Sequence, residues 1–346
     1  MLKNLLKKLP PNIYYNILTS HDVLQGTIWR RIAPAVDDAA FREKYKTLFV
    51  VGCGRSGTTI FSQCLGKHRD VVELNEPLHI WFATDMKADI ISPFAGLLRG
   101  RCRFDRHDAN EKARARYRAV IDYHVDGRAP VICDKLPLNT FRVDYVEAIH
   151  PNSKFIHLNR SPRAVARSIE QCVKRDGIWW GFNDVKWRAI RRYAETRPEL
   201  RKLIPLAVDD YYRGLIEWRI SQDLARDDLS NIHPDQYCEI DYDDFIANPV
   251  EVLEQAFAFI GLPVDQDAID FAKARVAPTG SADEDQQRRS IEDDRRHALI
   301  LGEDYHGGGK EKPREASFID PVSAPKRQAP NEKQQASEKQ QGADAG

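Results

Sequence analysis

Residues 47–59 read TLFVVGCGRSGTT, and this stretch decides the fold class. Five β-prone apolar residues run up to Gly52, and a helical pattern continues from Ile60 to Leu65. A glycine-rich turn between a buried strand and a helix presents backbone N–H groups and the positive end of the helix, and this combination binds anions. The stretch therefore predicts an anion-binding loop at the carboxyl end of a strand in an α/β fold.

Short apolar runs alternate with helical patterns along the rest of the chain. Further strands are expected at 71–74, 130–133, 154–158 and 237–240, and further helices at 162–173 and 250–260. Parallel strands joined by helices are covered on both faces, so they read as nearly continuous apolar runs. We predict a single α/β domain at residues 47–276, a P-loop-like parallel sheet flanked by helices, with helical inserts at 80–128 and 176–235.

The two ends of the chain differ in composition from this domain. Residues 1–46 are expected to form an N-terminal helical arm that is apolar-rich from Ile13 to Trp29. The Lys- and Leu-rich start fits a helix packed on the domain, which is the favoured interpretation, or a helix on a membrane surface. Residues 277–346 are expected to form a charged extension that is disordered from about residue 307, because its composition cannot bury enough apolar surface to offset the entropy of ordering.

The composition excludes several classes of protein. Apolar residues make up 42% of the 346 residues, and the 52 basic and 52 acidic side chains cancel. A nucleic-acid-binding protein normally carries a net positive charge, so no nucleic-acid partner is expected. No apolar run approaches the roughly 20 residues of a membrane-spanning helix, and the six cysteines form no Cys-x-x-Cys pair. We expect a cytoplasmic protein without a metal site; its oligomeric state stays open.

The loop departs from that of nucleoside triphosphatases at one position. Gly52 and Gly57 have the spacing of a Walker A motif, but Thr58 occupies the position of its lysine. Without this lysine the chain lacks the cation that reaches the β- and γ-phosphates during phosphoryl transfer. An atypical P-loop kinase and a non-catalytic nucleotide-binding module are therefore kept as alternatives.

A second basic element follows the strand expected at 154–158. Arg160 ends this strand, and Ser161 and Pro162 are residue types preferred where a helix begins. Ser168 lies two turns into that helix. A guanidinium and a hydroxyl can together bind a phosphate, and the alternative is that Arg160 forms a surface ion pair.

The loop and this second element together resemble the sulfotransferase family that uses 3′-phosphoadenosine 5′-phosphosulfate (PAPS). The family's 5′-phosphosulfate loop is similar to RSGTT at residues 55–59, and its 3′-phosphate site is similar to Arg160 with Ser168. A Lys-x-Pro segment at 135–137 lies between them, as in the family.

A later Tyr-Asp segment at 242–245, followed by Asn248 and Pro249, also matches in the expected order. The resemblance covers about residues 47–262. In motif spacing it is closest to the glycan and tyrosylprotein branch.

The resemblance implies a sulfuryl donor and the residues that bind it. PAPS would be the co-substrate, released as 3′-phosphoadenosine 5′-phosphate (PAP), and fixed cations and amides would take the place of a metal ion. The residues implied to bind the co-substrate are Arg55, Ser56, Gly57, Thr58, Thr59, Arg160 and Ser168.

Three residues are expected to act in catalysis. Arg55 would stabilise the sulfuryl oxygens, and Lys135 would neutralise the bridging oxygen as it leaves. Glu76 follows the strand at 71–74, at about the position where members of the family with a glutamate base carry it. A carboxylate near several cations is ionised at neutral pH, ready to accept the proton of a hydroxyl group.

Other assignments stay open. Glu76 could instead support Arg55, with His79 as the base, and no local signal identifies the residue that stacks on adenine, for which Trp218 is the candidate. The acceptor is expected to carry a hydroxyl group. The aromatic and arginine side chains between Trp179 and Tyr193 suit a glycan, or else pack the insert onto the core.

Overall fold

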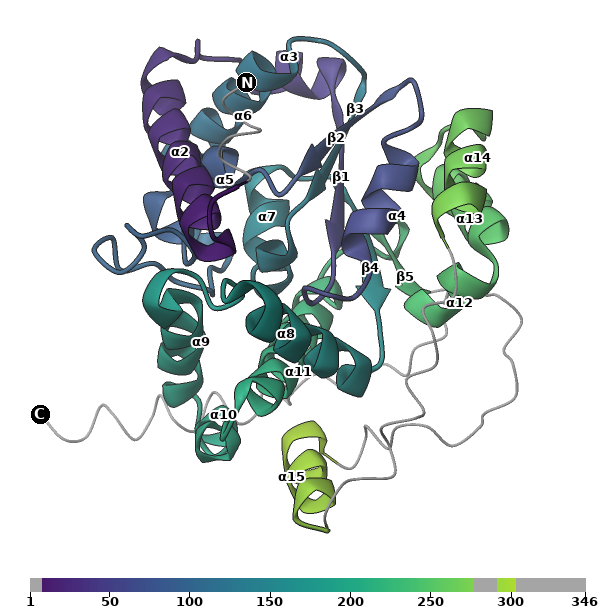
Figure 1. Cartoon of the computed structure of the whole chain (residues 1–346). Coiled ribbons are helices and arrows are strands. Elements are labelled where there is room, and N and C mark those ends of the chain that lie inside the picture. The colour runs from purple at the N-terminus through teal and green to yellow at the C-terminus, as the bar shows by residue number, and fades with distance from the viewer. Residues whose placement is uncertain (1–7, 277–290, 303–346) are drawn as a thin grey trace, which may run out of the picture.

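The computed structural model describes residues 8–276 and 291–302 of the chain. At its centre lies one sheet of five parallel strands in the order β2-β3-β1-β4-β5 (Figure 1). The strands are β1 (Lys46–Val51), β2 (Val71–Asn75), β3 (Val131–Lys135), β4 (Lys154–Asn159) and β5 (Tyr237–Asp241). All five predicted strands are present, and the predicted α/β fold is confirmed.

Helices cover both faces of the sheet (Figure 1). One face carries α4 (Thr58–Leu65), α12 (Tyr242–Ala247), α13 (Pro249–Ile260) and α14 (Gln266–Arg275). The other carries α5 (Leu78–Thr84), α6 (Glu111–Val125), α7 (Val143–Ile149), α8 (Pro162–Asp176) and α11 (Asp210–Leu229). The remaining helices are α2 (Pro11–Ile32), α3 (Asp38–Lys44), α9 (Val185–Glu195), α10 (Pro198–Arg201) and α15 (Ile291–Leu301).

The central strand β1 contributes side chains to the hydrophobic core on each face of the sheet. Successive side chains of a strand point to opposite faces of the sheet. Leu48 and Val50 accordingly pack into the core with α4 and α13, whereas Phe49 and Val51 pack into the core with α5 and α11. Both faces of the strand are buried, which explains why its sequence is apolar without alternation.

The N-terminal arm is tied closely to the domain. The helix expected from Ile13 to Trp29 is present within α2, which packs along α5. Gly26 makes this packing close, because a Cβ atom there would lie 2.5 Å from the carbonyl oxygen of His79. Within the described ranges, no helix combines the length and the apolar content needed to cross a bilayer.

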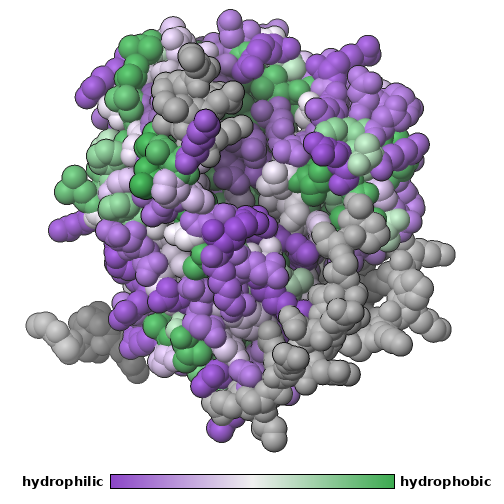
Figure 2. Space-filling model, in the orientation of Figure 1, coloured by the Kyte–Doolittle hydropathy of each residue, from purple (hydrophilic) through white to green (hydrophobic). Residues whose placement is uncertain are grey.

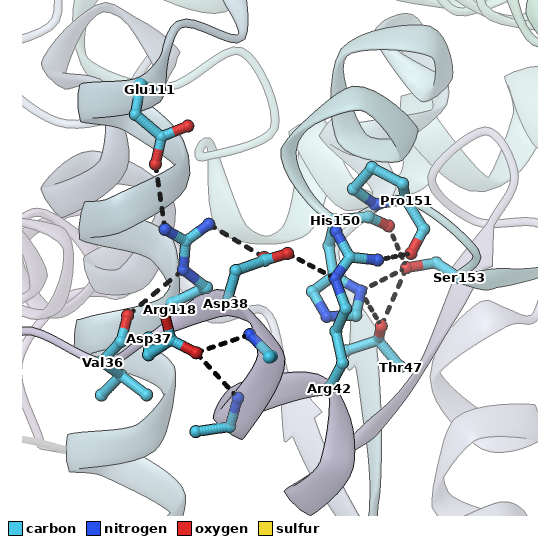
Figure 3. A network of polar contacts seen from close by, with 12 residues as sticks. Val36, Asp37, Asp38, Arg42, Thr47, Glu111, Arg118, His150, Pro151 and Ser153 are labelled. Carbon is cyan, nitrogen blue, oxygen red and sulfur yellow. Dashed lines mark hydrogen bonds and ion pairs between the residues drawn. The ribbon is translucent and has the colours of Figure 1, made fainter.

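A polar network anchors α3 at the amino-terminal edge of the sheet (Figure 3). Asp38 accepts from Arg42 at 2.7 Å and from Arg118 of α6 at 3.1 Å. Beside it, Oγ1 of Thr47 in β1 lies 2.6 Å from Nδ1 of His150. Burial lowers the pKa of His150 to about 4, so this histidine is neutral. The network fixes the start of β1 at the edge opposite the glycine-rich loop.

One helix of the C-terminal extension packs on α11. In α15 the backbone oxygen of Leu301 accepts from Arg219 at 2.6 Å, and His297 lies 2.7 Å from the hydroxyl of Tyr211. The sequence analysis did not predict this helix. The predicted disorder from about residue 307 concerns residues outside the described ranges.

Candidate active site

The loop after β1 is shaped by conformations and contacts that few side chains allow. Gly57 has a φ of +86°, and a Cβ atom there would lie 2.1 Å from the ring of Tyr242. Glycine is therefore required at this position. Arg55 has a φ of +74°, a left-handed conformation that is uncommon outside glycine. Thr140 secures the first turn, since its hydroxyl accepts from the N–H of Gly52 at 2.7 Å and donates to the Gly52 carbonyl at 2.8 Å.

The loop leaves polar groups open. Among the described residues, the backbone N–H groups of Gly57, Thr58 and Thr59 meet no acceptor. The side-chain oxygen of Ser56 is fully buried and also has no partner there. Buried polar groups in native proteins are normally paired, and α4 adds positive charge at its first turn. The loop thus fits an anionic group.

Arginines from two distant segments meet beside the loop. The Arg55 Nε donates to the hydroxyl of Ser168 in α8 at 2.9 Å, and Nη1 of Arg160 donates to the carbonyl of Arg55 at 2.8 Å. The Arg160 guanidinium also lies 4.3 Å from the ring centre of Tyr242. We call these four residues, Arg55, Arg160, Ser168 and Tyr242, the anion cluster.

The anion cluster joins residues predicted at the two ends of the co-substrate. Arg55 is predicted at the 5′-phosphate and sulfuryl oxygens, and its side chain lies with Ser168, the residue predicted at the 3′-phosphate. Ser161 occupies the position just before α8, as expected, without making a capping hydrogen bond through its side chain, and Pro162 opens the helix.

A lysine and a glutamate form a second group at the ends of β2 and β3. Asn75 is paired with Lys135 in the sheet, and the N–H of Glu76 donates to the Lys135 carbonyl at 2.7 Å. The ammonium of Lys135 lies 2.9 Å from Oε1 of Glu76 and 3.0 Å from the hydroxyl of Thr59 in α4. We call Glu76 and Lys135 the reaction pair.

The two members of the reaction pair differ in exposure. The Lys135 side chain is fully buried, whereas that of Glu76 is 47% exposed. A buried cation needs a charged partner, and Glu76 supplies it for Lys135. The Oε2 atom of Glu76 receives no hydrogen bond from the described residues, so it can accept a proton. In the described part of the chain, no group of three or more His, Cys, Asp or Glu side chains is placed to hold a metal ion.

Asp134 precedes Lys135 in β3, and its side chain points to the other face of the sheet. Its carboxylate is fully buried and accepts from the indole N–H of Trp81 at 2.9 Å. Burial raises the pKa of Asp134 to about 7, against the smaller opposing effects of Trp81, Arg142 and Lys135. The sequence analysis did not single out this residue, because a carboxylate before a lysine is common.

His79 and Trp218 have other surroundings than those suggested for them. The His79 ring packs 5.0 Å from Trp29 of α2 and 5.3 Å from His124 of α6. Burial lowers the pKa of His79 to about 4. Trp218 is only 1% exposed and donates from its indole to the Arg160 carbonyl at 3.0 Å. Trp218 therefore holds the end of β4 and offers no free ring face to adenine.

Two of the aromatic side chains between Trp179 and Tyr193 are part of the core. Trp180 and Trp187 are buried and pack edge to face at 5.6 Å. Trp179 differs, because it is partly exposed and covers the loop, where a Cβ atom on Gly54 would lie 2.4 Å from its ring. Its indole donates to Glu217 at 2.8 Å. This contact joins residues far apart in the sequence, so no local pattern could reveal it.

A model of the sulfotransferase family matches residues 47–266. The chain belongs to the sulfotransferase family. The matched region contains the loop, the anion cluster and the reaction pair, all in the α/β domain of this sulfotransferase.

Two curated proteins are similar in sequence to part of this chain. An uncharacterized protein of Aquifex aeolicus is 24% identical over 262 residues, which cover 71% of this chain and 29% of that protein. The protein-tyrosine sulfotransferase of Drosophila melanogaster is 21% identical over 224 residues, which cover 65% of this chain and 40% of that protein. The sulfotransferase chain thus spans less than half the length of either relative.

The solved structures that are similar to the chain include two sulfotransferases. The sulfotransferase domain from the curacin biosynthetic pathway has a TM-score of 0.43 at 21% identity, covering 66% of this chain and 77% of that domain. The sulfotransferase from Alicyclobacillus acidocaldarius has a TM-score of 0.39 at 18% identity, covering 74% of this chain and 95% of that one.

Proposed function

We propose that this sulfotransferase transfers a sulfuryl group from PAPS to a hydroxyl group of an acceptor. The observation that carries the proposal is the reaction pair. A half-exposed carboxylate lies 2.9 Å from a buried ammonium, and that ammonium lies 3.0 Å from Thr59 at the start of α4. A proton acceptor and a cation thus stand together beside an open anion-binding loop.

The described residues fit the two anionic ends of PAPS. The open N–H groups at Gly57–Thr59 and the unpartnered Ser56 hydroxyl suit the 5′-phosphosulfate. Arg160 and Ser168 of the anion cluster suit the 3′-phosphate, with Arg55 between the two sites. When bound, PAPS supplies the sulfuryl group and a phosphate as the leaving group.

The reaction pair then divides the chemistry between its two members. Oε2 of Glu76 accepts the proton of the acceptor hydroxyl while the new bond from oxygen to sulfur forms. The Lys135 ammonium stabilises the phosphate oxygen whose bond to sulfur breaks. Lys135 and the loop N–H groups are fixed before the reaction begins, so they stabilise developing charge without rearranging.

We take carbohydrate as the first acceptor class to test. Trp179 supports this choice, because its ring is partly exposed beside Gly54 of the loop and can contact a sugar there, while the Lys186 ammonium lies 3.8 Å from the ring centre. The cysteines at 53, 64, 102, 133, 172 and 238 are free and buried. Free thiols are typical of a reducing compartment, so we also propose that the protein acts in the cytoplasm.

The experiment is a transfer assay with ³⁵S-labelled PAPS. Saccharides and a tyrosine-containing peptide serve as acceptors in parallel, with excess EDTA, and Glu76→Gln is compared with the wild type. We expect labelled saccharide from the wild type and a strong loss in the variant. Label on the peptide alone would overturn the carbohydrate proposal. Phosphoryl transfer from ATP that stops without magnesium, with no transfer from PAPS, would overturn the whole proposal in favour of a kinase.

A further inference from the structure

The outer face of α2 carries a row of exposed aliphatic side chains. Ile13, Ile17, Leu24, Ile28 and Ile32 recur at intervals of four and seven residues, which places them along one side of a helix. Together with Leu18 they are between 38% and 58% exposed. Figure 2 shows hydrophobic side chains gathered over α2, next to a hollow in the same face of the molecule. Apolar patches of this kind mark interaction surfaces.

Basic residues stand at both ends of this row. Arg31 is exposed at the end of α2, and Lys8 is exposed just before its start. Asp22 is the one carboxylate of α2, and it points inward, with Oδ1 lying 3.9 Å from Nδ1 of His79. In sequence, the residues before Lys8 add further lysines and three leucines. The outer face of α2 thus combines aliphatic side chains with basic groups and presents no negative charge.

We propose that this face of α2 binds the surface of an anionic membrane. Helices that lie in the membrane interface bury an apolar side among the lipids and pair basic residues with anionic headgroups. A second copy of the chain fits this face less well. Basic residues stand at both ends of α2, so a parallel or an antiparallel pair would bring like charges together.

The site of sulfuryl transfer lies on the inner side of the same helix. The α5 helix, which packs along α2, begins two residues after Glu76. Besides burial, the charge of Glu76 raises the pKa of Tyr15 on the inner side of α2. Membrane binding through the outer face would therefore leave Glu76 on the side of α2 that faces away from the lipid.

Sedimentation of the full-length chain with lipid vesicles tests the proposal. The vesicles contain phosphatidylcholine alone or with 30% phosphatidylglycerol. The buffer has about physiological ionic strength. We expect binding that increases with the anionic lipid and weakens at high salt. The triple variant Ile17→Gln, Leu24→Gln, Ile28→Gln should bind at least tenfold less. These side chains are already exposed, so its thermal unfolding should match that of the wild type.

A matched triple variant controls for loss of exposed apolar surface in general. Val208→Gln, Val264→Gln and Leu299→Gln change side chains that are 50–56% exposed on other parts of the chain, and this variant should bind as the wild type does. Equal vesicle binding by wild type and the α2 variant would overturn the proposal. Failure of the wild type to bind either kind of vesicle would also overturn it. A dimeric wild type that the α2 variant converts to a monomer would show that the face joins two copies instead.

Discussion

The anion cluster and the reaction pair differ in the kind of contact that holds their side chains in place. The anion cluster joins side chains from the loop, α8, α12 and the end of β4, and its arginines bond to a carbonyl and a hydroxyl that carry no charge. The reaction pair joins the ends of adjacent strands through an ion pair whose cation is fully buried. The arginines of the anion cluster can replace these neutral partners with a phosphate. The ion pair of the reaction pair, in contrast, stays in place. We infer that the cluster determines affinity and the pair determines rate.

The largest expected effect comes from the reaction pair. Glu76→Gln keeps the shape and one acceptor oxygen but cannot take a proton, so kcat should fall by about 10²–10⁴-fold. PAP affinity should stay the same, because the loop and the anion cluster are unchanged. Steady-state transfer rates and calorimetry measure the two quantities. Glu111→Gln, at the exposed start of α6, is the control. Loss of both rate and PAP affinity would show that Glu76 has a structural role.

The buried carboxyl group of Asp134, next to Lys135 in β3, predicts that stability depends on pH. Asp134 ionises near pH 3.8 in the unfolded chain and near 7 in the folded protein. Its contribution to stability is therefore present below pH 3.8 and is lost as the pH rises towards 7. Asp134→Asn removes this loss but can still accept from the Trp81 indole.

Urea unfolding at several pH values measures this effect. Relative to the wild type, the free energy of unfolding of Asp134→Asn should rise by about 2–4 kcal/mol between pH 4.5 and 7.5. His79 and His150, whose pKa values are lowered, are common to both proteins and cancel in the comparison. Parallel pH profiles would contradict the assignment of this titration to Asp134.

A substitution in the anion cluster should change the affinity for PAP. Arg160→Gln removes a charged contact with the 3′-phosphate, so PAP should bind more than tenfold more weakly, as expected from about 1.5–3 kcal/mol per charged hydrogen bond. AMP, which lacks that phosphate, should lose much less affinity. Calorimetry with both nucleotides tests this, with Arg175→Gln at the far end of α8 as control. Equal losses for PAP and AMP would place Arg160 elsewhere.

The smallest expected effect concerns Tyr242, where two variants distinguish the role of the ring from that of the hydroxyl group. The ring lies under the Arg160 guanidinium and against Gly57, so Tyr242→Phe should bind PAP as the wild type does. Tyr242→Leu removes the ring and the contact with the cation, which contributes about 0.5–2 kcal/mol. PAP affinity should therefore fall several-fold. If both variants bind equally well, the ring does not position Arg160.

The sequence predicts the sheet well because its signal is local. The three central strands, β1, β3 and β4, are buried on both faces, and their apolar residues mark them clearly. The edge strands β2 and β5 are buried only in part, and shorter apolar stretches mark them. The loop is equally clear, since Gly52 and Gly57 are residues that its backbone conformation and close contacts require.

Side-chain directions were harder to predict. Residue type does not show that Arg55 adopts a left-handed conformation and reaches Ser168, 113 residues away. The contact of Trp179 with Gly54 and Glu217 likewise depends on how the insert folds back over the loop. His79 follows Glu76 closely in sequence, yet α2 and α6 enclose it. Such outcomes depend on tertiary packing, which a pattern along one chain does not specify.

The complete burial of Lys135 has a consequence for chemical modification. Reagents that acylate amines, and enzymes that acetylate lysine, need an exposed amino group. The Lys135 amine is enclosed between Thr59 and Glu76, whereas Lys8, Lys44 and Lys174 stand on the surface. The Lys135 amine, to which we assign a role in the proposed reaction, is therefore shielded while the protein stays folded. This sulfotransferase should tolerate attachment to a solid support through its surface lysines and keep its activity there.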